Sequence, residues 1–173
     1  MPGSFIGAAR YHDFSAGHRV VGQGGPCEGL HGHNYRVYFE VMADVNKIGM
    51  VLDFGIIKEL LCDWLEYNWD HQMLLWDQDP LHHIMFPDKA KAQDEDATWR
   101  VLGSIVSVPF NPTAEAMAQH LLKVVGPTQL AGMNATLHKV TVWETRKCYG
   151  FATLNWQPPI SYTLEETMDV RSK

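Results

Sequence analysis

Alternating apolar and polar positions give the clearest structural signal in the chain, over residues 33–45 (HNYRVYFEVMADV). Side chains of a β-strand alternate between two faces, so this stretch predicts a strand that is buried on one side. The apolar face is formed by Tyr35, Val37, Phe39 and Val41. Residues 5–20 also have strand character, with less regular alternation. A loop rich in glycine (QGGPCEG) separates these two strands, and a short third strand is expected over residues 50–52.

Helical spacing replaces the alternation after residue 52. Apolar side chains then recur every three or four positions, which predicts an amphipathic helix to about residue 67. They are Ile56, Ile57, Leu60, Leu61, Trp64 and Leu65. Asp53 is the expected N-cap of this helix. A second helix is expected with Asn111 as its cap, Pro112 as its first helical residue and Gly126 at its end.

Three further strands complete the predicted order β, β, α, β, α, β, β. Residues 99–110 predict one strand, and residues 138–145 and 148–156 predict a pair joined by a turn. Residues 76–98 carry a charged run and predict a loop or a small insertion. Long antiparallel strands with helices on one face indicate an α+β fold. The length of 173 residues fits one domain, residues 1–173.

Composition narrows the range of functions. The formal net charge of −6 and the pI near 5.8 argue against a nucleic-acid partner, because phosphate binding needs clustered Lys and Arg. No apolar run is long enough to span a membrane, and the first residues lack the apolar core of a signal peptide. The three cysteines are odd in number and widely spaced, which favours free thiols in a reducing compartment. We therefore expect a cytoplasmic protein with no membrane partner.

The strongest chemical signal is CEGLHGHNY, residues 27–35. In a strand, His31 and His33 project from the same face, because side chains alternate with period two. His18 lies late in the first predicted strand and supplies a third nitrogen if the two strands pair. Three histidines leave one position of a tetrahedral zinc ion open, which is typical of catalytic zinc. We therefore predict that His18, His31 and His33 bind Zn²⁺.

Cys27 has two interpretations. As a fourth zinc ligand it would make the site structural; as a thiolate beside a cation that lowers its pKa, it would be a reactive group. The residues alone leave both open. Cys62 is expected to pack inside the first helix, and Cys148 receives no role. His82 and His83 are expected to belong to a solvated loop.

Six motifs follow one another along the chain: FSAGH, C-x3-HGHNY, MVLDFGIIK, DH, NPTAE and WET. This ordered set, over about residues 5–155, resembles the 6-pyruvoyltetrahydropterin synthase and 6-carboxytetrahydropterin synthase (QueD) family. The resemblance implies a tunnelling fold (T-fold), in which each subunit contributes a four-stranded antiparallel sheet with two helices on one face. It also implies that three subunits close a barrel, and that two trimers stack into a homohexamer with active sites at subunit interfaces.

The resemblance also implies catalytic residues. It places zinc on the three histidines and matches Cys27 to the catalytic cysteine. Asp70 and His71 match an aspartate–histidine pair that assists the cysteine, from a neighbouring subunit.

Substrate-binding residues follow from the same resemblance. Glu144 matches the glutamate that anchors the pterin ring, and a carboxylate can accept two hydrogen bonds from the donor edge of a pterin. Its place on the strand after Val140 and Val142 predicts that it points to the apolar side. Thr113 and Glu115 match positions that line the pterin pocket. Arg19 is a candidate for binding the triphosphate of the substrate.

The favoured function is that of a zinc-dependent 6-carboxy-5,6,7,8-tetrahydropterin synthase. Such an enzyme converts 7,8-dihydroneopterin triphosphate and releases triphosphate and acetaldehyde, on the route to queuosine and other 7-deazaguanines. The spacing of three residues between Cys27 and His31, and the Asp-Phe of MVLDF, favour this branch. The alternatives are 6-pyruvoyltetrahydropterin synthase, a variant that makes 6-hydroxymethyldihydropterin, and a non-catalytic pterin-binding zinc protein. A metal-assisted hydrolase would need a carboxylate beside the zinc, and the sequence places none there.

Overall fold

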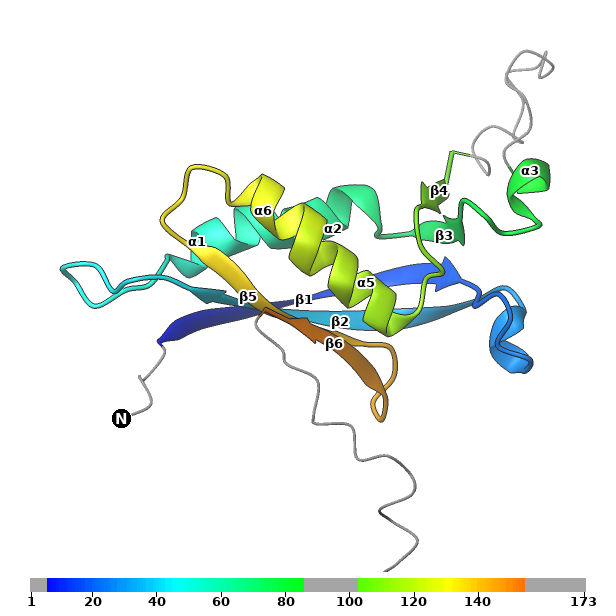
Figure 1. Ribbon diagram of the computed structural model, residues 1–173, viewed down its shortest axis with the longest axis horizontal. Coiled ribbons are helices and arrows are strands. Elements are labelled where there is room, and N and C mark those ends of the chain that lie inside the picture. Colours follow the sequence, from blue (N-terminus) through cyan, green and yellow to red (C-terminus); the bar gives the residue numbers. More distant parts are fainter. Residues whose placement is uncertain (1–5, 86–102, 155–173) are drawn as a thin grey trace, which may run out of the picture.

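The computed structural model describes residues 6–85 and 103–154. Strands of this part form one six-stranded sheet in the order β4-β3-β1-β2-β5-β6, and helices cover one of its faces (Figure 1). The strands are β1 (Gly7–His18), β2 (His31–Met42), β3 (Gln72–Trp76), β4 (Ile105–Val108), β5 (Thr136–Trp143) and β6 (Tyr149–Thr153). In the described ranges, no helix has the length and apolar character needed to cross a membrane.

The two long central strands, β1 and β2, pair antiparallel from Gly7 opposite Met42 to His18 opposite His31. β5 pairs antiparallel with β2, and β6 with β5. These four strands are the predicted antiparallel sheet. The prediction was incomplete, because β3 pairs with β1, and β4 with β3, in parallel orientation. The sheet is therefore mixed, and the fold is α+β as expected.

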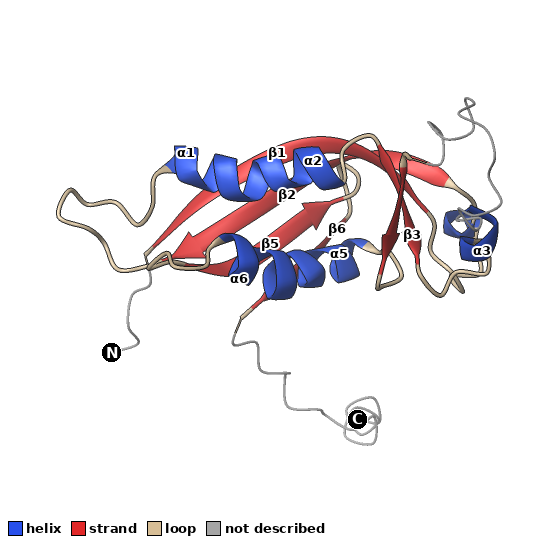
Figure 2. Ribbon diagram, turned by 90° about the horizontal axis from the view of Figure 1, so that it is seen from above, coloured by secondary structure: helices blue, strands red, loops and turns tan. Residues whose placement is uncertain are grey.

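Two helical stretches lie side by side over the same face of the sheet (Figure 2). The first consists of α1 (Phe54–Ile57), a π-helical turn (Lys58–Cys62) and α2 (Asp63–Asn68); the second consists of α5 (Ala114–His120), a π-helical turn (Leu121–Val125) and α6 (Gly126–Gln129). Asp53 caps the first, because its Oδ1 accepts a hydrogen bond from the Gly55 amide at 2.6 Å. The N-cap of α5 is Thr113, so the expectations that Asn111 caps this helix and that Pro112 is its first residue are wrong. Gly126 also does not end the helix but begins α6.

The hydrophobic core lies between the helices and the covered face of the sheet. The strands contribute Phe14, Tyr35, Val37, Phe39, Val41, Val140 and Val142, and the helices contribute Ile57, Leu61, Leu65, Met117, Leu121 and Val125. Cys62 is buried in this core, as expected for a packing residue. Along β2 the core-facing positions are the odd-numbered ones, so His31 and His33 continue the core face toward the start of the strand.

Other predictions of elements fail in detail. Residues 50–52 form bends and a loop instead of a strand. β3 was missed, because its sequence (QMLLW) is a short apolar run without alternation, which is typical of a strand buried on both faces. The predicted strand over residues 99–110 is reduced to β4 in the described part, and residues 99–102 lie outside it. The predicted loop over residues 76–98 contains α3 (His82–Met85), and its residues 86–98 lie outside the described residues.

Gly150 lets β6 approach the start of α5, and we expect Gly150→Ala to destabilise the fold. A Cβ atom at this position would lie 2.5 Å from the Glu115 backbone nitrogen and 2.7 Å from the Ala114 carbonyl carbon, and backbone atoms cannot rotate away. Overpacking of this kind costs about 1–3 kcal/mol, measured as the free energy of unfolding in urea. Gly29→Ala is the control, because a Cβ there meets only the Pro26 carbonyl oxygen at 3.4 Å. Equal stability of the two variants would contradict the prediction.

Candidate metal centre

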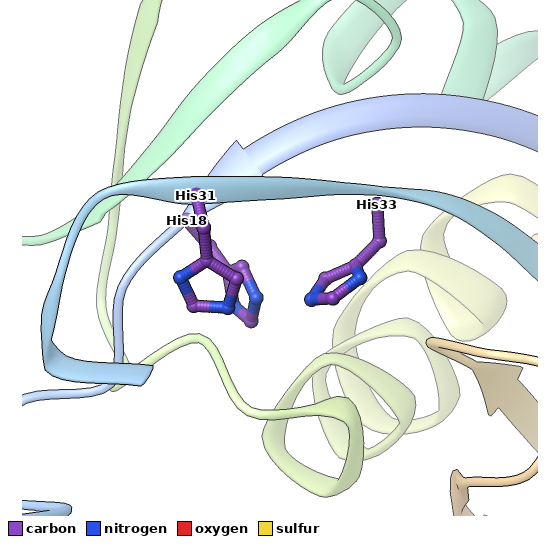
Figure 3. Close-up of side chains that lie close together, drawn as sticks. All are labelled: His18, His31 and His33. Carbon is purple, nitrogen blue, oxygen red and sulfur yellow. The ribbon is translucent and has the colours of Figure 1, made fainter. Parts of the chain in front are cut away.

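The three predicted histidines meet at the end of the central strands. The β1–β2 register places His18 directly opposite His31, and His33 opposite Ala16. Since His31 and His33 are two residues apart on β2, both project from the covered face, as expected. One nitrogen from each ring lies within 4.8 Å of the others. Figure 3 shows the three rings converging on one point.

Backbone carbonyls orient two of these rings. His18 Nδ1 lies 2.7 Å from the Pro112 carbonyl oxygen, and His31 Nδ1 lies 2.8 Å from the Gly29 carbonyl oxygen. In each case Nδ1 donates its proton, which leaves Nε2 as the nitrogen with a free lone pair. His18 is completely buried, and its Nε2 has no hydrogen-bond partner among the described residues. A buried nitrogen that makes no hydrogen bond is costly unless a ligand satisfies it, and two further histidine nitrogens lie within 4.8 Å, so the site fits a zinc ion.

Burial also sets the protonation of the cluster. It lowers the pKa of His18, and this effect outweighs the opposing influence of the Pro112 carbonyl and of Glu144. Burial lowers the pKa of His33 in the same way. The neutral imidazole, which is the form that binds a metal, is therefore favoured in both residues.

Glu144 brings a carboxylate to the histidines. It follows directly after β5, and its Oε1 lies 3.2 Å from His18 Nε2 and 3.8 Å from His33 Nε2. The side chain is 25% exposed and points to the covered side, as its strand position suggested. The sequence did not place a carboxylate beside the metal position, and the structure brings Glu144 there. The signal was missed because Glu144 is more than 100 residues from the histidines in the chain.

Cys27 lies in a short 3₁₀-helix, η1 (Pro26–Glu28), and is half-buried. Its carbonyl oxygen accepts a hydrogen bond from the Val20 amide at 2.8 Å, which ties the loop to the chain just after His18. In the described part of the chain, the group of potential metal ligands consists of the three histidines without the Cys27 thiol. This arrangement argues against Cys27 as a fourth ligand.

Asp70 and His71 form a second polar group at the edge of β1. Asp70 Oδ1 accepts a hydrogen bond from the Ser15 amide at 2.8 Å, and its Oδ2 lies 2.6 Å from His71 Nδ1. Burial alone would raise the pKa of Asp70, but these two hydrogen bonds outweigh it and hold the pKa below its usual value. Asp70 is thus ionised and orients the His71 ring.

His71 itself has an unusual backbone and an exposed ring. Its φ of 57° lies in the left-handed region, which a residue other than glycine adopts only at a cost, and its amide donates to the Ser15 carbonyl oxygen at 2.7 Å. The side chain is 83% exposed. An open groove of about 1500 Å³ is lined by Asp70 and His71 and also by His33 and Glu144, so both polar groups border the same space.

The remaining predicted residues, Thr113, Glu115 and Arg19, are not among those that line this groove. Thr113 Oγ1 accepts a hydrogen bond from the Ala116 amide, so its side chain caps α5. Glu115 is exposed in the first turn of α5. Arg19 is turned toward Asp79, and its Nε lies 3.3 Å from the buried Oδ2 of that residue. This ion pair occupies one edge of the Arg19 guanidinium.

Three groups in or beside the site received no role there from the sequence. The Pro112 carbonyl holds His18, and the Asn111 side chain bonds the backbone of Val21. The Tyr35 hydroxyl is buried and has no hydrogen-bond partner among the described residues. Burial raises the pKa of Tyr35, with a further contribution from Glu144, so the hydroxyl keeps its proton. Only the position of Tyr35 in HGHNY, two residues after His33, offered a signal.

Known proteins share this fold and part of this sequence. The chain matches the sequence model of the family described as 6-pyruvoyl tetrahydropterin synthase over residues 8–154. A 6-carboxy-5,6,7,8-tetrahydropterin synthase from Rickettsia felis is 33% identical over 145 residues, which cover 83% of this chain and 97% of that protein. Its counterpart from Rickettsia typhi is 34% identical over the same lengths.

Solved structures show the same architecture. An uncharacterized protein from Wolinella succinogenes superposes with a TM-score of 0.77 at 22% identity, over 88% of this chain and 100% of that one. The 6-pyruvoyl tetrahydropterin synthase from Plasmodium falciparum superposes with a TM-score of 0.62 at 21% identity, over 87% of this chain and 98% of that one. At these identities, the superpositions establish a common fold.

Proposed function

Because the chain belongs to the 6-pyruvoyl tetrahydropterin synthase family, a family of lyases, we propose that it is a zinc-dependent 6-carboxy-5,6,7,8-tetrahydropterin synthase. The substrates are 7,8-dihydroneopterin triphosphate and water, and the products are 6-carboxytetrahydropterin, triphosphate and acetaldehyde. The observation that carries the metal dependence is the convergence of three histidine nitrogens within 4.8 Å of one another, of which the buried Nε2 of His18 makes no hydrogen bond among the described residues. The choice of the carboxy branch is supported by the two Rickettsia relatives, which are 6-carboxy-5,6,7,8-tetrahydropterin synthases.

Three imidazoles leave space for substrate at the metal. When bound by His18, His31 and His33, zinc supplies a Lewis acid that polarises the hydroxyl groups of the pterin side chain. Glu144 borders the groove beside His18 and His33, so its carboxylate is available to accept hydrogen bonds from the donor edge of the pterin ring. We assign Glu144 this anchoring role.

Proton transfer is assigned to Cys27 and His71. The Cys27 thiolate takes a proton from the side-chain carbon and returns it toward the ring, which is the role of a general base and acid. His71 acts as the second proton-transfer group, because ionised Asp70 fixes its Nδ1 and leaves Nε2 free to face the groove. Its exposed ring suits a site that is completed by a neighbouring subunit of a homohexamer, a dimer of trimers.

Three further residues are proposed to contact the pterin ring or the triphosphate of the substrate. Thr113 and Glu115, at the start of α5, are proposed to line the pterin pocket. Arg19 keeps its role as a candidate for the triphosphate through the guanidinium nitrogens that do not face Asp79.

One assay tests the proposal. Zinc-loaded protein is incubated with 7,8-dihydroneopterin triphosphate, and the products are identified by mass spectrometry. We expect 6-carboxytetrahydropterin together with acetaldehyde in equal amounts. Formation of pyruvoyltetrahydropterin would indicate the pyruvoyl synthase instead. Formation of 6-hydroxymethyldihydropterin would indicate the variant that makes this product by cleaving the side chain. Tight pterin binding without turnover would contradict an enzyme and indicate a binding protein.

A further inference from the structure

Two hydrogen bonds join the loop that carries Cys27 to the residues that follow His18. The Val20 amide donates to the Cys27 carbonyl oxygen at 2.8 Å, and the Gly22 amide donates to Glu28 Oε1 at 2.8 Å. These bonds close the loop on itself. They do not by themselves determine where the closed loop sits relative to the three histidines.

A distant asparagine supplies that connection. Asn111 Oδ1 accepts a hydrogen bond from the Val21 amide at 3.0 Å, and Asn111 Nδ2 donates to the Val21 carbonyl oxygen at 2.8 Å. The two residues are 90 positions apart in the chain. One side chain thus satisfies both backbone groups of Val21, which lies directly between the two residues that close the loop. A primary amide is suited to this pairing, because it offers one donor and one acceptor side by side.

The next residue, Pro112, holds the metal ligand. Its carbonyl oxygen accepts the Nδ1 proton of His18 at 2.7 Å, so adjacent residues of one segment contact the metal centre and the cysteine loop. Thr113 then caps α5, which packs in the core through Met117. The segment is therefore anchored to a helix of the packed core.

We propose that Asn111 is a positioning residue that fixes the Cys27 thiol relative to the three histidines. It touches neither substrate nor metal and acts through Val21 and the hydrogen bond from Val20 to Cys27. Catalytic groups lose efficiency steeply when displaced, and a shift of about 1 Å costs roughly 100-fold in rate. The inference rests on the proposed function where it concerns turnover, and on the loop geometry alone where it concerns the accessibility of Cys27.

The test uses the zinc-loaded Asn111→Ala variant. We expect kcat to fall by about 10- to 100-fold with little change in KM, because substrate binding to zinc and Glu144 is retained. Zinc content should stay at the wild-type level. The half-buried Cys27 should react several-fold faster with iodoacetamide, measured by peptide mass spectrometry relative to the exposed Cys148 in the same sample.

Asn46→Ala is the matched control. Asn46 Oδ1 also accepts two backbone hydrogen bonds, from Ile48 and Met50, in the exposed loop after β2. This change removes a comparable set of bonds away from the histidines, so kcat and the Cys27-to-Cys148 reaction ratio should stay at wild-type values. An equal effect of both variants would overturn the proposal.

Further outcomes also decide the question. Loss of zinc from Asn111→Ala would show that the residue acts on His18 instead of Cys27, and an unchanged reaction ratio would show that it does not hold the loop. If Asn111→Ala does not fold, the isosteric Asn111→Asp keeps the acceptor for the Val21 amide but loses the donor to its carbonyl. We expect Asn111→Asp to lower kcat and to raise the Cys27-to-Cys148 reaction ratio, as in Asn111→Ala. An unaltered reaction ratio in Asn111→Asp overturns the proposal. If the wild-type protein lacks turnover, the proposed function fails. The ratio of iodoacetamide reaction at Cys27 to that at Cys148 still tests whether Asn111 holds the cysteine loop.

Discussion

His31→Ala is expected to remove zinc from the protein and to abolish turnover. His31 is half-buried and takes its orientation from the Gly29 carbonyl, so it contributes a directed Nε2 without belonging to the packed core. Changing a partner that only orients a ligand lowers metal affinity about 10- to 100-fold, and loss of a direct ligand costs more. Two remaining histidines do not hold the ion at ordinary concentrations. Without it, the hydroxyl groups of the substrate lose their Lewis acid.

Metal content and folding are measured together for this prediction. Zinc per chain is determined by atomic emission after gel filtration, and turnover by product formation. His138→Ala, on β5 outside the cluster, is the control and should retain zinc and activity. Circular dichroism should be unchanged in both variants. Full zinc occupancy in His31→Ala would show that the metal is held by another set of ligands.

The fold was predictable where a pattern repeats over many residues. The alternation around Val37 and Phe39 fixed the covered face of β2, and Asp53 marked the start of the first helix. β3 and β4 were harder to predict, because a short parallel strand is stabilised by neighbouring strands that are distant in sequence. The cap of α5 was misplaced by two residues for a similar reason. Asn111 has a side chain suited to capping, but this side chain is hydrogen-bonded to the backbone of Val21, 90 residues earlier in the chain.

The candidate site was predictable to the extent that its residues lie close in sequence or on one strand face. His31 and His33 follow from the strand period, and His18 follows once β1 and β2 pair. Glu144 beside the histidines depends on the path of β5 across the sheet, which no local pattern encodes. The pairing of Asn111 with Val21 depends in the same way on tertiary structure.

Cys27→Ala is expected to abolish turnover and to leave zinc in place. General acid–base groups contribute about 100- to 10,000-fold in rate, and alanine has no proton to transfer, so kcat should fall by this amount. Cys27 is half-buried in a short 3₁₀-helix, so the loss of its sulfur costs little packing. The His18, His31 and His33 nitrogens converge without it, which is why metal content should stay at the wild-type level.

Cys148→Ser separates the role of Cys27 from a general effect of thiol loss. Cys148 is exposed in the turn before β6, and its replacement should leave both zinc content and kcat unchanged. Binding of a pterin to Cys27→Ala, followed by its fluorescence, should persist, because Glu144 and the histidines are intact. Loss of zinc from Cys27→Ala would instead make the cysteine a structural ligand. Retained turnover would assign the proton transfer to His71 and Asp70, which border the same groove as His33.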